Sequence, residues 1–144
     1  RSYDGSEFRE RLEQALPGDA DEARLAAELR RLRRREMVRI VWRDLLRLAD
    51  LGETTRDLTW LAEATVEAAV AHGHAQLAAR HGEPRGRDSG APQRLVVLGM
   101  GKLGACELNL SSDIDLIFAT PSRARRTASA RSATRSSSRG SDSA

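Results

Sequence analysis

The chain of 144 residues carries 24 Lys and Arg, 21 Asp and Glu, and a single cysteine, Cys106. This length suits one modest domain, which buries roughly two thirds of the surface that its unfolded chain exposes. One cysteine excludes an internal disulfide framework, and no apolar stretch approaches the ~20 residues that span a bilayer. We therefore expect a reduced, cytoplasmic protein without a membrane partner.

The net charge of +3 comes from the C-terminal residues and not from the part expected to fold. Residues 121–144 hold six Arg and one Asp, which leaves 18 basic and 20 acidic side chains in residues 1–120. Nucleic-acid binding needs a basic face on the folded surface, so we expect no nucleic-acid partner. The same tail is Ser, Ala, Arg or Thr at 21 of 24 positions, without Leu, Ile, Val or aromatic residues, which predicts disorder.

Apolar periodicity predicts helices in the first part of the chain. Residues 6–16 repeat an apolar side chain at every fourth position, which is typical of a helix. A second helix is expected to begin after Asp19 or Asp21, either of which can serve as its N-cap. We expect this helix to continue, with a break near Glu36, until shortly before Gly52, which stands where a C-terminal capping glycine would.

A third helix and two strands complete the expected elements. The helix is predicted to begin at Thr54 or Thr55 and to run to His81. A segment with two Pro and two Gly follows at residues 83–93 and is typical of a linker. The helical spacing of apolar residues then ends, and the continuous β-prone runs at residues 95–98 and 113–118 predict two strands.

The first of these runs leads into a glycine-rich loop, GMGKLG at residues 99–104. It satisfies the GxGxxG pattern of dinucleotide-binding proteins, which makes a dinucleotide-binding module one alternative. However, only eight residues separate Gly104 from Asp113, whereas a parallel βαβ crossover needs about a dozen or more. In the dinucleotide fold the acidic residue also comes about 20 residues later, at the end of its strand.

A nucleotidyl-transfer site fits the loop better. Glycines let the backbone approach a phosphate, and amide groups at a short helix start donate to its oxygens. The loop also contains the only lysine of the chain, which would add a positive charge. The candidate phosphate- and nucleotide-binding residues are Gly99, Gly101, Lys102, Gly104, Ser111 and Ser112.

Asp113 and Asp115 are the candidate catalytic residues. They stand two apart on an expected strand, so both side chains project from the same face and reach one hard cation. With Mg²⁺ bound, they would neutralise charge on a phosphate and align the attacking and leaving oxygens. The sequence therefore predicts a magnesium site at Asp113 and Asp115.

A run of basic residues at 30–35 has two interpretations. Its guanidinium groups would suit substrate phosphates, or they form a solvated helix face beside Glu28 and Glu36. The second interpretation is the simpler one, because charge runs on helices are commonly solvated.

Together, these motifs carry a resemblance to a known family. The segments GMGKLG, ELN and SSDIDLIF, with LRRLRRREMVRIVWRDLLRLADL upstream, resemble the bacterial glutamine synthetase adenylyltransferase/adenylyl-removing enzymes. The resemblance runs from about Asp21 to Thr120. It implies an α+β fold, in which a helical N-terminal bundle leads into a truncated polymerase β-like nucleotidyltransferase domain with a mixed sheet.

The resemblance also implies a reaction. Family members have two homologous halves, and ELN-x-SSDIDLIF after REMVRI resembles the first, which removes AMP from a tyrosine of glutamine synthetase by Mg²⁺-dependent phosphorolysis. The ATP-dependent adenylylating half is the close alternative. The implied partners are glutamine synthetase, ATP or ADP, phosphate and a nitrogen-signalling regulatory protein. By resemblance, Asp113 and Asp115 bind the metal, and the residues around the phosphates are Gly101, Lys102, Gly104 and Ser112.

The chain departs from the family in two places. Ala105-Cys106 stand where family members often have a further glycine, and no later strand supplies the third carboxylate of the superfamily. We expect a frameshifted tail over 121–144 and an incomplete chain that is inactive alone; a structural fragment with a remnant site is a further alternative. The expected organisation is a helical segment at 1–83, a linker at 84–93, the start of the nucleotidyltransferase domain at 94–120, and the tail.

Overall fold

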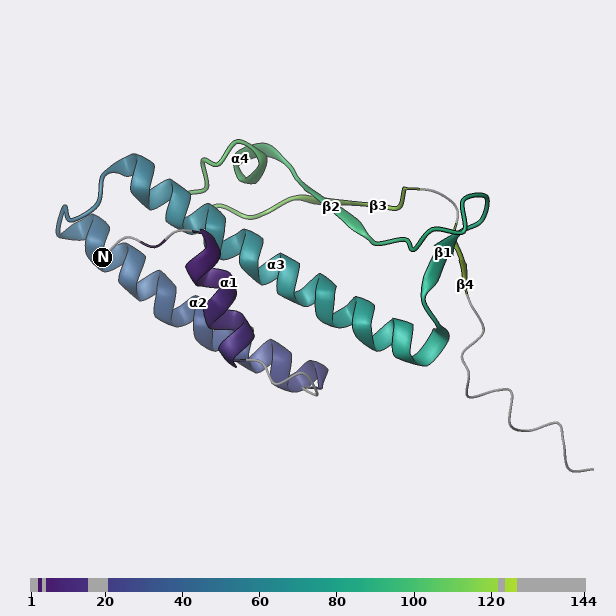
Figure 1. Cartoon of the computed structure of the whole chain (residues 1–144). Helices are drawn as coiled ribbons and strands as arrows, with labels where there is room; N and C mark the ends of the chain where they lie inside the picture. Colours follow the sequence, from purple (N-terminus) through teal and green to yellow (C-terminus); the bar gives the residue numbers. More distant parts are fainter. Residues whose placement is uncertain (1–2, 4, 16–20, 122–123, 127–144) are drawn as a thin grey trace, which may run out of the picture. The chain divides into compact units, whose positions relative to one another are not determined.

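The computed structural model describes Tyr3 and residues 5–15, 21–121 and 124–126 (Figure 1). In chain order, the elements are α1 (Gly5–Ala15), α2 (Glu22–Leu45), α3 (Leu51–His81), β1 (Pro84–Gly86), β2 (Val96–Gly99), α4 (Gly101–Gly104), β3 (Leu116–Ala119) and β4 (Ala124–Arg126). Long helices combined with small antiparallel strand pairs agree with the α+β class expected from the sequence. The polymerase β-like arrangement stays a prediction.

The described residues form two compact units. One holds those up to His72 together with Val97–Ala119, and the other holds Gly73–Val96 with the described residues from Thr120 on. The domain boundaries expected from the sequence stay a prediction. No helix among the described residues is long and apolar enough to cross a membrane.

The start of α2 confirms the capping signal. Asp21 has extended backbone angles, and its side chain accepts a hydrogen bond of 2.7 Å from the backbone N–H of Arg24. The break expected near Glu36 is wrong, because α2 continues unbroken to Leu45. Glu36 faces the protein interior, with 1% of its surface exposed, and it has ion-pair partners there.

The turn between α2 and α3 differs from the expectation. Arg47 takes the left-handed conformation, with φ of 54°, and α2 ends before it. Asp50 then caps α3, since its Oδ1 accepts a hydrogen bond of 2.7 Å from the backbone N–H of Glu53. Helix α3 therefore begins at Leu51, earlier than predicted, and Gly52 lies in its first turn.

Buried charges connect α2 to α3. The Arg39 guanidinium donates to Glu36 Oε2 at 2.7 Å and to Asp57 Oδ2 at 2.8 Å, and the Tyr3 ring lies 4.0 Å from it. Asp57 is 2% exposed, and its Oδ1 has no hydrogen-bond partner in the described part of the chain. Burial raises the pKa of Asp57 despite the hydrogen bond from Arg39, which acts in the opposite direction.

One apolar core joins the helices to the glycine-loop segment. Its buried members come from α1, α2, α3, α4 and the loop that follows α4. They are Phe8, Leu12, Leu32, Ile40, Leu58, Leu61, Ala64, Leu103 and Leu108. Leu103 and Leu108, which are 5% and 3% exposed, therefore fix the loop segment to the helices.

The expected linker contains a strand and a turn. β1 pairs antiparallel with β4, with Pro84 opposite Arg126 and Gly86 opposite Ala124. The tail expected to be disordered thus forms a strand at Ala124–Arg126, since β1 supplies its backbone partners. The rest of that prediction falls largely on residues 122–123 and 127–144, outside those described, and stays a prediction.

Asp57→Ala is expected to lower the free energy of unfolding by about 3 kcal/mol, because it removes the α2–α3 ion pair and leaves the largely buried Arg39 with one carboxylate fewer. Urea unfolding followed by circular dichroism measures this loss. Glu67→Ala is the control, since it removes an ion pair with Arg9 whose side chains are 60% and 54% exposed, and should cost at most about 1 kcal/mol. Equally small losses in both variants would contradict a structural role for the buried pair.

Candidate functional site

The glycine loop is a tight turn from β2 into α4. A Cβ added at Gly104 would lie 2.5 Å from the backbone oxygen of Gly99, and one added at Gly99 would lie 2.8 Å from the Leu103 side chain. Gly101 has a φ of 54°, which favours glycine. The close contact with the Gly99 backbone requires glycine at 104, while the positions of Gly99 and Gly101 favour glycine.

The loop is attached to the aspartate segment through the backbone. The Met100 N–H donates to the Asp115 carbonyl oxygen at 2.9 Å. Strands β2 and β3 form one two-stranded sheet and run in opposite directions (Figure 1). This β2–α4–β3 arrangement, with an α4 of four residues, is not the parallel βαβ unit that binds dinucleotides.

Asp113 and Asp115 lie just before β3, which corrects their predicted position on a strand from residue 113. The strand begins only at Leu116, after the carbonyl of Asp115 has accepted the bond from Met100. Both aspartates are exposed. Because neither residue lies on the strand, strand geometry does not place their side chains on one face. Their role as metal ligands stays a prediction.

Asn109 organises the residues before the aspartates, and the sequence analysis did not single it out. Its Oδ1 accepts hydrogen bonds from the hydroxyls of Ser112 at 2.7 Å and Ser111 at 3.2 Å, and from the Ser111 N–H at 3.2 Å. Asn followed by Ser two and three positions later is a turn signal that identifies this role. Both serine hydroxyls thus have a protein partner in this turn.

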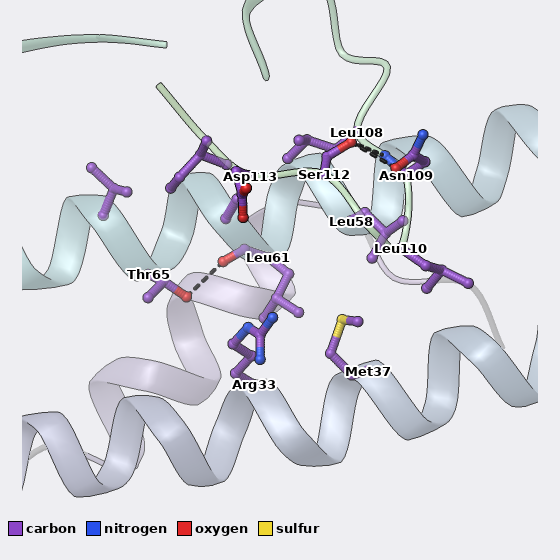
Figure 2. Close-up of a pocket in the computed structure, with 13 residues that line it drawn as sticks. Arg33, Met37, Leu58, Leu61, Thr65, Leu108, Asn109, Leu110, Ser112 and Asp113 are labelled. Carbon is purple, nitrogen blue, oxygen red and sulfur yellow. Dashed lines mark hydrogen bonds between the residues drawn. The ribbon is translucent and has the colours of Figure 1, made fainter. Parts of the chain in front are cut away.

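A cavity of about 320 Å³ lies between this turn and the helices (Figure 2). Arg33 and Met37 reach it from α2, and Asp113 reaches it from above in the view of Figure 2. The lining residues are Arg33, Met37, Leu58, Leu61, Ala62, Thr65, Val66, Leu108, Asn109, Leu110, Ser112, Asp113 and Ile114. Of the predicted site residues, the structure brings Ser112 and Asp113 to the cavity, while Lys102 is exposed and Asp115 is outside the lining.

The two aspartates suit Mg²⁺ in donor chemistry. This ion is commonly bound through one or two carboxylates, with waters and substrate phosphate oxygens completing its shell. The described residues contain no group of three His, Cys, Asp or Glu side chains that could hold a metal ion. Asp113 and Asp115 would supply two carboxylate ligands to such an ion, and this assignment stays a prediction.

Comparison with known proteins gives the family. A family model described as "Glutamate-ammonia ligase adenylyltransferase" matches residues 3–139. The chain belongs to this family. The match extends beyond the resemblance noted over Asp21–Thr120 and includes most of the tail.

Curated members of the adenylyltransferase family are closely similar to the chain. Two of them carry the name "Bifunctional glutamine synthetase adenylyltransferase/adenylyl-removing enzyme". The Pseudomonas aeruginosa protein is 56% identical over 115 residues, which are 80% of this chain and 12% of that protein. The Thioalkalivibrio sulfidiphilus protein is 54% identical over 123 residues, 85% of this chain and 13% of that protein. The chain thus spans about an eighth of the length of these relatives.

Gly104→Ala is expected to destabilise the fold by about 1–3 kcal/mol, because its Cβ would meet the rigid Gly99 carbonyl. Thermal unfolding measures the change. Gly73→Ala in α3 is the matched control, since its Cβ would have no neighbour within 4 Å, and it should stabilise by about 0.5–1 kcal/mol. A gain in stability in both variants would show that the loop lacks this close approach.

Proposed function

We propose that the chain carries the beginning of a Mg²⁺-dependent nucleotidyltransferase site that removes AMP from adenylylated tyrosine of glutamine synthetase. In this reaction an oxygen of inorganic phosphate forms a bond to the adenylyl phosphorus. The bond between that phosphorus and the tyrosine oxygen breaks, and the tyrosine oxygen takes up a proton. The products are ADP and free tyrosine.

The observation that supports the proposal best is the hydrogen bond from the Met100 N–H to the Asp115 carbonyl at 2.9 Å. It holds a glycine loop beside a pair of carboxylates, while Leu103 and Leu108 fix both segments to the helical core. Phosphoryl and nucleotidyl transfer need this pairing of backbone donors and metal-binding acids. The names of the relatives give the same chemistry for proteins with which the chain shares about half of its residues.

Each group has a role in this proposal. Asp113 and Asp115 would hold Mg²⁺, which supplies charge neutralisation at the phosphate when bound. Gly101 has open space where a Cβ would stand and would allow close approach of the phosphate to the backbone, while Gly99 and Gly104 shape the loop. Lys102 would add a positive charge. Asn109 holds both serine hydroxyls and the N–H groups of Ser111 and Ser112, so this turn fixes the backbone next to the aspartates.

We infer the direction of the reaction from a resemblance of the local motif. ELN-x-SSDIDLIF after REMVRI resembles the adenylyl-removing half, whereas the ATP-dependent adenylylating half uses the same kind of site in the opposite sense. A polymerase β-like domain, a cytoplasmic location and a nitrogen-signalling regulatory partner belong to this proposal as well. For the chain alone we expect nucleotide binding without turnover, because it spans about an eighth of the length of its relatives.

Binding of AMP and ADP to the 144-residue chain should depend on Mg²⁺ in isothermal titration. Replacing Asp113 and Asp115 together by alanine is expected to remove the metal-dependent part of the affinity, about tenfold or more. Glu10→Ala with Glu13→Ala is the matched control, because it removes two exposed acids from α1 and should leave binding unchanged.

Two outcomes of this titration would contradict the proposal. NAD binding that is indifferent to Mg²⁺ would favour a dinucleotide module. Absence of binding by AMP, ADP and NAD would favour a structural fragment with a remnant site.

A further inference from the structure

We propose that the cavity beneath the Leu108–Ile114 segment receives the nucleoside of the adenylyl group, and that Arg33 contacts its phosphate. This inference rests on the proposed function, since it assigns the substrate's two parts to two places at the same site. Its evidence lies in the shape and chemistry of the cavity, whose lining includes Asp113 of the aspartate pair.

The inner wall of the cavity is apolar. Leu58, Leu61 and Leu108 line it and are 6%, 4% and 3% exposed, and Met37 adds a thioether from α2. A volume of about 320 Å³ is at the small end of ligand pockets, which are mostly apolar with a few placed polar groups. A flat heteroaromatic ring with a sugar suits such a space, because its faces gain from burial.

The rim of the cavity has a cation and a carboxylate. Arg33 and Asp113 are both exposed and both line the space, from α2 and from the loop (Figure 2). A guanidinium binds a phosphate directly through its fork of donors. A carboxylate would do so through a bound cation, so the two groups together would suit a phosphate that carries a divalent metal.

Arg33 differs from its neighbours in the basic run. Arg31 pairs with Glu28 at 2.9 Å, and Arg35 pairs with Glu36 at 3.1 Å. Arg33 lies one helical turn before Met37, and both line the cavity, whereas the neighbouring Arg34 lies outside the lining. The solvated helix face is therefore an incomplete account of this run, since one of its members lines a pocket.

Placing the nucleoside in the cavity positions the scissile ester. A base against Leu58 and Leu61 leaves the 5′-phosphate at the rim, between Arg33 and Asp113. The bond to be broken then lies at the side of the cavity that the aspartate segment borders. Arg33 would neutralise part of the phosphate charge in the bound state.

The test uses calorimetric titration of the full 144-residue chain with AMP, adenosine and inorganic phosphate, each with Mg²⁺. Arg33→Gln should weaken AMP binding about tenfold and leave adenosine unchanged, because the lost contact is to phosphate. Arg34→Gln, its matched control, should stay within about twofold of the parent for every probe.

Ala62→Leu fills part of the cavity and should weaken AMP and adenosine about tenfold while leaving inorganic phosphate unchanged. Ala69→Leu, on the exposed side of α3, is the matched control and should change nothing. If Ala62→Leu fails to fold, methyl NMR of the parent chain replaces it, with AMP and adenosine expected to shift the Leu58, Leu61 and Val66 methyl signals.

The two proposals fail differently. Unchanged AMP binding in Ala62→Leu, or no methyl shifts at the cavity, overturns the nucleoside assignment even where the aspartate variants lose metal-dependent affinity. Binding of inorganic phosphate at the rim without adenosine binding in the cavity overturns it as well. The converse result is AMP binding that is weakened by Ala62→Leu and yet unchanged by removal of Mg²⁺ or by replacement of Asp113 and Asp115. That result supports the nucleoside site in the cavity and contradicts the proposed function.

Discussion

The structure depends on the buried ion pair between Arg39 and Asp57, which sets the register of α2 against α3. Taking these charges out of water is costly, and a buried pair offsets that cost only with good geometry. Here Glu36 supplies a second carboxylate, and one Asp57 oxygen still lacks a partner in the described chain. Such a cluster tolerates few alternative arrangements, so we infer that it specifies the register of the two helices.

The same register continues along the hairpin. Arg43 pairs with Glu53 at 2.7 Å, four residues beyond Arg39 on α2 and four before Asp57 on α3. Extending this antiparallel match toward the other end of α2 brings Arg33 and Met37 to the part of α3 around residues 58–66. These residues line the cavity, so the ion pair determines which side chains form it.

The functional loop depends on this frame through two leucines. Leu103 from the four-residue helix α4 and Leu108 from the segment that follows are both nearly completely buried in the core of the helices. Apart from these contacts, the strand pair is small and exposes Leu98, Ile117 and Phe118 at 49%, 47% and 59%. A two-stranded sheet is marginal by itself, so the helices supply the rigidity of the site.

The structural features that depend on interactions between neighbouring residues could be predicted from the sequence. The cap of α2, for which Asp21 was one of two candidates, the period of α1 and the glycine loop were predicted from the sequence, because each depends on neighbours a few residues away. The end of α2 was not predicted correctly, because the left-handed residue after it is Arg47 and not the glycine that usually takes this conformation. The pairing of β1 with β4 joins residues about forty positions apart, and the cavity requires the α2–α3 register. Neither the strand pairing nor the cavity could be predicted from the sequence, because both depend on residues far apart in the chain.

The most direct test of the account is paramagnetic broadening of amide NMR signals by Mn²⁺, a substitute for Mg²⁺, in the 144-residue chain with AMP. The account predicts that Ser112–Asp115 and Met100–Lys102 lose intensity first, at low Mn²⁺, and that Arg33 follows. Residues around Glu10 and Glu13 on α1 should keep their intensity. Equal broadening at those α1 residues, or none at Asp113 and Asp115, would contradict a metal and phosphate site at the aspartate segment.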